Sequence, residues 1–206
     1  MAIYLNTYRP LICRRAGRIA ARKYGLAPFI DSSCRREPDF QSKFPSISAL
    51  CRFDKFAPRL REDDIVVYLT VKKKYLDVSE AHWRLTAILQ VLKRFASHKD
   101  AAAWYREQGL CLPSNCMVAG NPPIPLDQTS ATHESVEEWD RGYRFRAIKC
   151  PVFLACNAVH LELYNPPIVT KKIMLEVFGR FPATQNPPSI AGHQCNQLRN
   201  LVSAKG

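Results

Sequence analysis

Two apolar runs near the middle of the chain set the strongest limits on its fold. Ile65–Thr70 is rich in β-branched and aromatic residues and follows the charged turn Arg61–Asp64, a pattern typical of a buried strand. In the second run, Trp83–Phe95, apolar residues alternate with others over much of the length, which favours a long strand over a helix. The sequence therefore predicts a sheet in the middle of the chain.

Helices and further strands are expected on both sides of these two runs. A short strand over Ala2–Tyr8 precedes a basic helix over Leu11–Tyr24, and a second helix begins at the cap Ser97 and continues through Gln108. The C-terminal half is predicted to contain strands over Ala147–Asn157 and Val159–Tyr164, a helix from the cap Thr170 to Phe178, and a final helix from Ser189. This mixture predicts an α+β fold.

The chain is short enough to form one domain, which we predict over residues 1–206. Ten of its fifteen prolines lie between Pro113 and Pro188, where the unit Asn-Pro-Pro occurs three times and fixes turns and extended backbone. The alternative is a Pro-rich C-terminal extension that begins at about residue 111. No Gly/Ser linker marks such a boundary.

Composition excludes several protein classes. Apolar residues make up 47% of the chain and charged residues 23%, which argues against disordered, collagen-like and coiled-coil proteins. No segment reaches the roughly 18 apolar residues of a membrane span, and the N-terminus has no secretory apolar run. We therefore expect a cytoplasmic protein that does not contact membranes, with its eight cysteines reduced.

Positive charge is concentrated at the start of the chain. The formal net charge is +12, and the segment Met1–Arg61 contains 13 Lys and Arg against 4 Asp and Glu. A concentrated positive field attracts phosphate groups and makes binding depend on salt. The N-terminal third is therefore the predicted place for a nucleic acid or nucleotide.

Familiar catalytic and metal motifs are missing. The chain has no G-x-x-x-x-G-K-[ST], G-x-G-x-x-G, H-E-x-x-H or G-x-S-x-G sequence, so we expect no nucleotide cofactor and no known hydrolase site. The metal candidates are the pair Cys111 and Cys116 and the group Cys150, Cys156 and His160. Cys150 and Cys156 would share one face of a strand, as core residues do, so no metal site is predicted.

The polar loop Cys34–Asp39 is the most informative segment. Arg35 and Arg36 offer planar guanidinium groups suited to phosphate or a base edge. Glu37 and Asp39 either hold these arginines or act as general acid and base. An equally supported alternative is a salt-bridge network that only fixes the loop.

Two neighbouring segments add candidate binding residues. The hydroxyl groups of Ser46 and Ser48, followed by Arg52, are suited to a phosphate or to an extruded base, although Ser46 can instead cap a short helix. Beyond them, aromatic residues surround Lys72–Lys74, and Trp83 is the predicted stacking wall. Core packing is the alternative for this ring.

Several motifs resemble known families. The step Arg61–Tyr68 resembles the PUA-like superfamily, which includes the EVE, ASCH and YTH domains. The motifs C-R-R-E-P-D-F (Cys34–Phe40), S-I-S-A-L-C-R (Ser46–Arg52) and L-P-S-N-C (Leu112–Cys116) resemble the nucleotide-modification-associated domain proteins of bacteria and phages. The resemblance implies a small mixed β-barrel flanked by helices, with a pocket for RNA or an extruded modified base.

The resemblance also suggests roles for particular residues. Tyr68 and Trp83 are the candidate residues for a YTH-like aromatic cage. Thr70, Lys72 and Glu37 supply the residue types that ASCH amidohydrolases use on acylated cytidine, without a motif match.

Three hypotheses follow for the function. The first is a binding protein for DNA, RNA or a modified nucleotide; the sequence does not choose among these ligands. The second is an enzyme that modifies a nucleotide or base with Glu37 or Asp39 as acid and base. The third is a protein that binds another protein through its basic face. The sequence does not predict an oligomeric state.

Overall fold

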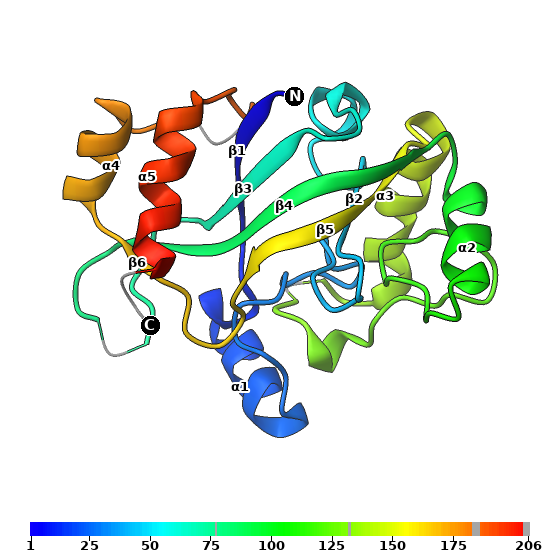
Figure 1. Ribbon diagram of the computed structural model, residues 1–206. Coiled ribbons are helices and arrows are strands. Elements are labelled where there is room, and N and C mark those ends of the chain that lie inside the picture. The colour runs from blue at the N-terminus through cyan, green and yellow to red at the C-terminus, as the bar shows by residue number, and fades with distance from the viewer. Residues whose placement is uncertain (77, 132, 183–185, 204–206) are drawn as a thin grey trace.

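The structure is a curled mixed sheet with helices at its flanks (Figure 1). It is a computed structural model that describes residues 1–76, 78–131, 133–182 and 186–203. Its strands are β1 (Ile3–Tyr8), β2 (Ser46–Ser48), β3 (Ile65–Thr70), β4 (Trp83–Phe95), β5 (Phe153–Leu161) and β6 (Ile168–Val169). Its α-helices are α1 (Arg15–Tyr24), α2 (His98–Glu107), α3 (Val136–Lys149), α4 (Lys171–Phe178) and α5 (Gly192–Ser203). The predicted α+β fold class is confirmed.

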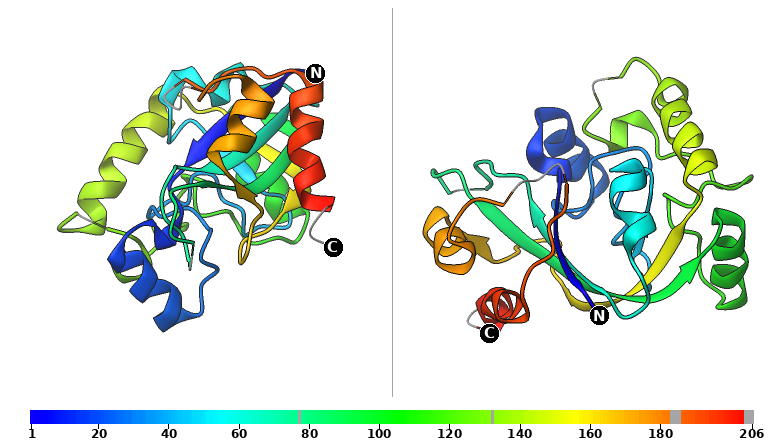
Figure 2. Two further views of the ribbon diagram at one scale, coloured as in Figure 1. Left: turned by 90° about the vertical axis from the view of Figure 1, so that its left-hand side faces the viewer. Right: turned by 90° about the horizontal axis from the view of Figure 1, so that it is seen from above.

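The sheet has the strand order β1-β3-β4-β5-β2, and β6 pairs with the start of β4. The β1–β3 pair is parallel and all other pairs are antiparallel. The register shifts once between β3 and β4 and twice between β4 and β5. Such irregularities increase local twist and bending. The sheet consequently curves into a half-barrel around the loops that follow α1 (Figure 2).

Both faces are buried along β3 and along the first half of β4, whereas β4 and β5 have exposed residues further along. Along β3, Val66 and Tyr68 belong to the apolar cluster on one face, which also contains residues of the loops that follow β2. Val67 and Leu69 point to the opposite face, where they pack with residues of α4 and α5. The helices α2 and α3 lie at the other end of the sheet (Figure 1).

A bulge in β4 decides which residues face which side. Tyr68 is paired with Ala87, but its neighbour Leu69 is paired with Leu85, so Thr86 is the extra residue. One extra residue reverses the alternation of side chains along a strand. Leu85 and Trp83 therefore lie on the face covered by α4 and α5, although Ala87 lies on the other face.

Most elements that the sequence predicted are present. The strands β3 and β4 have the predicted bounds, and β1 begins one residue after the predicted start. The side chains of Ser97 and Thr170 accept hydrogen bonds from Asp100 N and Ile173 N, as the predicted caps of α2 and α4. The final helix α5 begins a few residues after the predicted start.

Three details of the predicted secondary structure are wrong. Ala147 lies in α3, so the strand predicted over Ala147–Asn157 begins only at Phe153 and then continues to Leu161. Ser46 does not cap a helix, because it begins β2. The helix predicted over Leu11–Tyr24 is interrupted at Arg14, whose extended backbone separates a 3₁₀ turn from α1.

The described part of the chain includes no helix whose length and apolar character suit a membrane crossing.

Gly17 fixes how closely α1 approaches the turn before it. An ideal Cβ at this position would lie 1.8 Å from the carbonyl oxygen of Leu11, which cannot move without the backbone. We expect Gly17→Ala to lower the free energy of unfolding by about 1–3 kcal/mol, the usual cost of overpacking. Urea denaturation followed by circular dichroism would measure this change.

Gly142 in α3 is the matched control. A Cβ at this position would meet no atom within 4 Å. Because alanine is the better helix former, Gly142→Ala is expected to raise the free energy of unfolding by about 0.5–1 kcal/mol. Equal stability of the two variants would contradict the close approach at Gly17.

Candidate functional site

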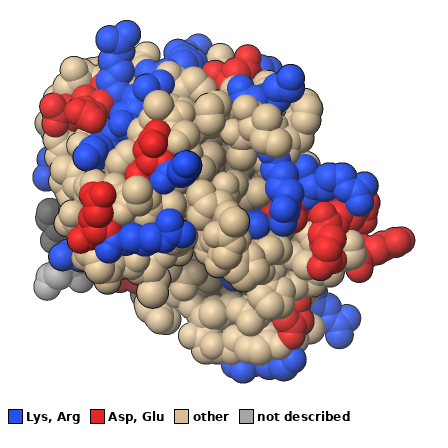
Figure 3. Space-filling model, turned by 90° about the vertical axis from the view of Figure 1, so that its right-hand side faces the viewer, with Lys and Arg blue, Asp and Glu red and all other residues tan. Residues whose placement is uncertain are grey.

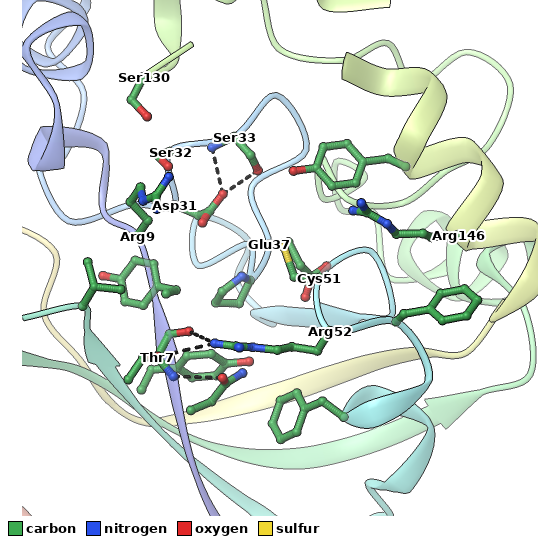
Figure 4. A pocket seen from close by; sticks show the side chains of 18 of the residues that line it. Thr7, Arg9, Asp31, Ser32, Ser33, Glu37, Cys51, Arg52, Ser130 and Arg146 are labelled. Carbon is green, nitrogen blue, oxygen red and sulfur yellow. Dashed lines mark hydrogen bonds between the residues drawn. The ribbon is translucent and has the colours of Figure 1, made fainter. Parts of the chain in front are cut away.

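A cavity of about 830 Å³ opens between the end of β1 and α3, a size typical of small-molecule sites (Figure 4). Its walls come from residues 6–14, from the loop 31–38, from the segment 51–56 and from residues 130–146. The side chains of Tyr68 and Val71 complete the lining. We refer to this space as the cavity.

Arg35 joins the loop 31–38 to α3. Its Nε donates to Asp140 Oδ1 at 2.6 Å and its Nη2 to Asp140 Oδ2 at 3.1 Å, and both side chains are only 2% exposed. Its Nη1 donates to the carbonyl oxygens of Ser114 and Asn121. The guanidinium group is thus fully engaged by the protein, and it holds two walls of the cavity together.

Arg36 stabilises the same loop through hydrogen bonds to backbone carbonyl oxygens. Its Nη1 donates to Asp31 O at 2.5 Å and its Nη2 to Gln128 O at 2.8 Å. Its Nε has no hydrogen-bond partner among the described residues, and burial lowers the pKa of the guanidinium group. Arg36 is 1% exposed and does not line the cavity.

Glu37 lies at the cavity with its carboxyl group in a polar cradle. Ser48 N donates to Oε1 at 2.9 Å, and Asn115 Nδ2 donates to Oε2 at 2.9 Å. The Ser48 hydroxyl also donates to Oε2. Burial raises the pKa of Glu37 to about 8, although these three hydrogen bonds lower it. At neutral pH the cavity therefore contains mainly the protonated, uncharged acid.

Burial also raises the pKa of two other groups on the inner wall. Asp31 accepts hydrogen bonds from Ser33 N at 2.9 Å and from Ser33 Oγ at 2.5 Å, but burial raises its pKa. Burial likewise raises the pKa of the Cys51 thiol, which stays protonated at neutral pH. Burial thus opposes ionisation of these two groups, and the exposed residue Asp54 also lines the cavity.

Five basic residues line the cavity. They are Arg9, Arg14, Arg52, Lys55 and Arg146. Arg52 donates to Thr7 O at 3.0 Å, and Arg146 donates to Leu50 O at 2.8 Å. Within the described residues, the guanidinium groups of Arg9 and Arg14 have no hydrogen-bond or ion-pair partner. Arg9, Arg52 and Arg146 reach the cavity from different sides (Figure 4).

On the side of the molecule shown in Figure 3, Lys and Arg side chains are interspersed with Asp and Glu side chains. On this side, the excess positive charge does not form one uniform patch.

Aromatic rings form the remaining walls. Tyr68 meets Tyr8 edge to face, with ring centroids 6.2 Å apart. On the opposite side, Trp139 of α3 stacks on His133 at 4.5 Å, and Arg146 lies 5.4 Å from the centroid of the Tyr143 ring. Flat aromatic surfaces next to arginines are suited to a heterocyclic base.

The structure brings only some of the predicted site residues to the cavity. Glu37, Arg52 and Tyr68 line it. Arg35, Arg36, Asp39, Ser46 and Ser48 lie behind its wall and support the loop 31–38. Asp39 accepts hydrogen bonds from Ser114 N and Oγ at 2.7 Å, and Ser46 donates to Asn115 Oδ1 at 2.7 Å.

Three predicted residues lie elsewhere. Trp83 packs on the face covered by α4 and α5 and stacks on Phe181 with centroids 5.8 Å apart. Lys72 Nζ lies 5.1 Å from the centroid of the Trp83 ring, so the two are neighbours away from the cavity. Thr70 is buried and accepts a hydrogen bond from Arg84 N.

Sequence reasoning missed the wall that α3 provides. This helix carries Trp139, Tyr143 and Arg146, and it begins with a capping box in which the Ser135 side chain accepts a hydrogen bond from Glu138 N. The pattern S-x-x-E was the available signal for the start of the helix. The placement of its residues against a loop about a hundred positions earlier had no local signal.

The described residues contain no group of three or more His, Cys, Asp and Glu side chains placed to hold a metal ion. Cys156 lies in β5, but Cys150 follows the last residue of α3 and is not in a strand, contrary to the prediction. Both side chains contact the same apolar cluster of the sheet.

Comparisons with known proteins give one weak match. No protein-family model and no curated protein matches the chain. Among solved structures, the chain is similar to the ASCH protein from Zymomonas mobilis, with 8% identity and a TM-score of 0.36 over 97% of this chain and 95% of that chain. Similarity at this level carries no function from one protein to the other, and membership of the PUA-like superfamily stays a prediction.

Proposed function

We propose that the cavity binds one nucleotide unit of DNA or RNA, with a plain or modified base. The phosphate group would contact Arg9 and Arg14 at the edge of the cavity. The base would lie against the Trp139 ring of α3, opposite the buried wall that includes Tyr68 and Glu37. The volume of about 830 Å³ is sufficient for a ligand of this size.

The observation that carries this proposal is the pair of unpartnered arginines at the edge of a cavity in which burial raises the pKa of Glu37 to about 8. Guanidinium groups bind phosphate through two parallel hydrogen bonds, provided that protein carboxylates do not occupy them. Arg35 is occupied in this way by Asp140, whereas Arg9 and Arg14 are free for a ligand within the described structure. An anion at this position would meet little repulsion from protonated Glu37.

The inner wall is suited to the edge of a base. The lining includes Ser32 and Ser130, whose hydroxyl groups can each donate and accept hydrogen bonds. Arg52 lies at the same wall and is held by Thr7 O at 3.0 Å, so its orientation is set before a ligand arrives. A site with its polar groups already in place loses less entropy on binding.

Removal of the two free arginines tests the proposal. We expect the double variant Arg9→Ala/Arg14→Ala to bind single-stranded oligonucleotides about tenfold or more weakly, with the slope of log K against log salt reduced by about two. Fluorescence anisotropy with labelled plain and base-methylated RNA and DNA oligonucleotides, over a salt series, would measure both quantities.

The matched control removes the same charge elsewhere. Arg61 and Arg94 are exposed and do not line the cavity, so Arg61→Ala/Arg94→Ala should change affinity much less. Equal losses in the two double variants would mean that only the overall charge matters. Absence of binding at low salt by the unmodified protein would remove the proposal.

Catalysis on the bound nucleotide is a second candidate function, favoured by the pKa of Glu37. A carboxyl group whose pKa lies at about 8 can give or take a proton near neutral pH, as general acid–base catalysis requires. Mass spectrometry of nucleosides and oligonucleotides after incubation with the protein separates the two functions. A binding protein leaves them unchanged, whereas an enzyme alters their mass.

A further inference from the structure

A second hollow adjoins the cavity on the outer face of α3. It has a volume of about 590 Å³ and is lined by Phe53, Glu138, Arg141, Gly142, Phe145 and Arg146. We refer to it as the α3 hollow. Phe53 and Arg146 line both spaces, so the α3 hollow and the cavity are neighbours that share these two side chains.

The α3 hollow presents a ring and a cation to solvent. Phe145 is 59% exposed and makes no ring contact with any described residue. Arg141, one helical turn earlier and so on the same side of α3, is exposed and has no ion-pair partner in the described chain. One exposed ring alone needs no explanation, but a ring and an arginine beside a cavity form a stacking platform with a phosphate contact.

The backbone between the two spaces is unusual. Arg52 and Phe53 both have left-handed φ angles, 69° and 47°, although neither is glycine. Consecutive residues in this region are energetically unfavourable and persist where the surrounding structure imposes them, often at ligand sites. Here they place Arg52 at the inner cavity and the Phe53 ring at the boundary with the α3 hollow.

We propose that the α3 hollow holds the nucleotide next to the one in the cavity, so that the ligand is a nucleotide within a single strand. The inference rests on the proposed function of the cavity. The neighbouring base stacks on Phe145 and its phosphate contacts Arg141. The shared wall of the two spaces and the charge of Arg141 and Arg146, which exceeds that of Glu138, favour this occupant over a protein segment.

The proposal predicts an effect that depends on ligand length. Phe145→Ala should weaken binding of a randomised single-stranded pentanucleotide pool by roughly fivefold to a hundredfold, the range that loss of one stacked base represents. It should leave binding of a mixture of nucleoside 5′-monophosphates unchanged. Anisotropy for the labelled pools, of RNA and of DNA in separate arms, and calorimetry for the monophosphates would measure these affinities.

Ile148→Ala is the matched control, because Ile148 is 78% exposed on the same helix but does not line the α3 hollow. It should bind the pentanucleotide pool as the unmodified protein does, and Phe145→Trp should retain full affinity because it keeps a flat ring. Circular dichroism would confirm that each variant is folded.

The outcomes separate this inference from the proposed function. If Phe145→Ala and Ile148→Ala bind the pool equally well, or if Phe145→Ala weakens monophosphate binding to the same degree as pool binding, the α3 hollow is not a separate subsite. The cavity proposal would still stand if Arg9→Ala/Arg14→Ala weakened monophosphate binding.

Discussion

Replacement of Asp140 by alanine is expected to lower the free energy of unfolding by about 3–5 kcal/mol, the usual cost of breaking a buried ion pair. The variant would leave the Arg35 guanidinium group, which is 2% exposed, without a counter-charge. Burial disfavours the Asp140 carboxylate, but hydrogen bonds from Arg35 and Arg144 outweigh it and hold its pKa below the ordinary value. Urea denaturation at pH 7 would measure the loss.

Measurements at low pH and a control variant at an exposed ion pair test this prediction further. Because the folded pKa of Asp140 is lowered, its contribution is present above the ordinary carboxyl pKa and is lost as pH falls through the folded value. The difference between Asp140→Ala and the unmodified protein should therefore shrink in acid. Glu176→Ala, which breaks the exposed Lys172–Glu176 pair, should leave the denaturation midpoint almost unchanged. Equal effects of the two variants would show that Asp140 is not a buried anchor.

Because folded Glu37 holds a proton that the unfolded chain releases, the free energy of unfolding is expected to fall as pH rises from about 5 to about 8. Burial raises its pKa from 4.5 to about 8, so in this window the folded chain binds a proton that the unfolded chain releases. Stability is thus fully present below the unfolded pKa and declines until the folded pKa is passed, by an amount on the order of a few kcal/mol. Denaturation midpoints measured at intervals of pH would reveal the decline.

Glu37→Gln isolates this residue from other groups. The variant cannot ionise at position 37, so its stability should depend less on pH than that of the unmodified protein between pH 5 and pH 8. Burial also raises the pKa of Asp31, which remains in both proteins, so the remaining pH dependence of Glu37→Gln includes the contribution of Asp31. Parallel pH curves for the two proteins would contradict a protonated Glu37.

The same titration should affect a bound anion. Once Glu37 ionises above pH 8, it repels a phosphate-bearing ligand, so oligonucleotide affinity should fall in the unmodified protein and stay flatter in Glu37→Gln.

Local patterns in the sequence were sufficient to predict much of the secondary structure. The bounds of β3 and β4 follow from apolar runs, and the starts of α2 and α4 follow from the side chains of Ser97 and Thr170. These signals act within a few residues of one another. They remain visible without knowledge of the tertiary structure.

The candidate site was less predictable because it depends on distant contacts. Alternation along β4 gives no warning of the bulge at Thr86, which sends Trp83 to the face opposite Ala87. A pair of arginines in a loop does not reveal whether its partner is a ligand or an aspartate 105 positions later. Arg9 and Arg14, whose charges the sequence showed only as part of a basic third, became site candidates when α3 supplied the facing wall.

Two walls of the cavity come from distant parts of the chain, residues 6–14 and residues 130–146. A ligand that contacts both would act as a cross-link between regions that meet only in the folded protein. Its affinity would add directly to resistance against unfolding, since the open chain offers it no comparable site. Ligand binding and folding would in that case be thermodynamically linked, and short fragments of this protein would neither fold nor bind the ligand.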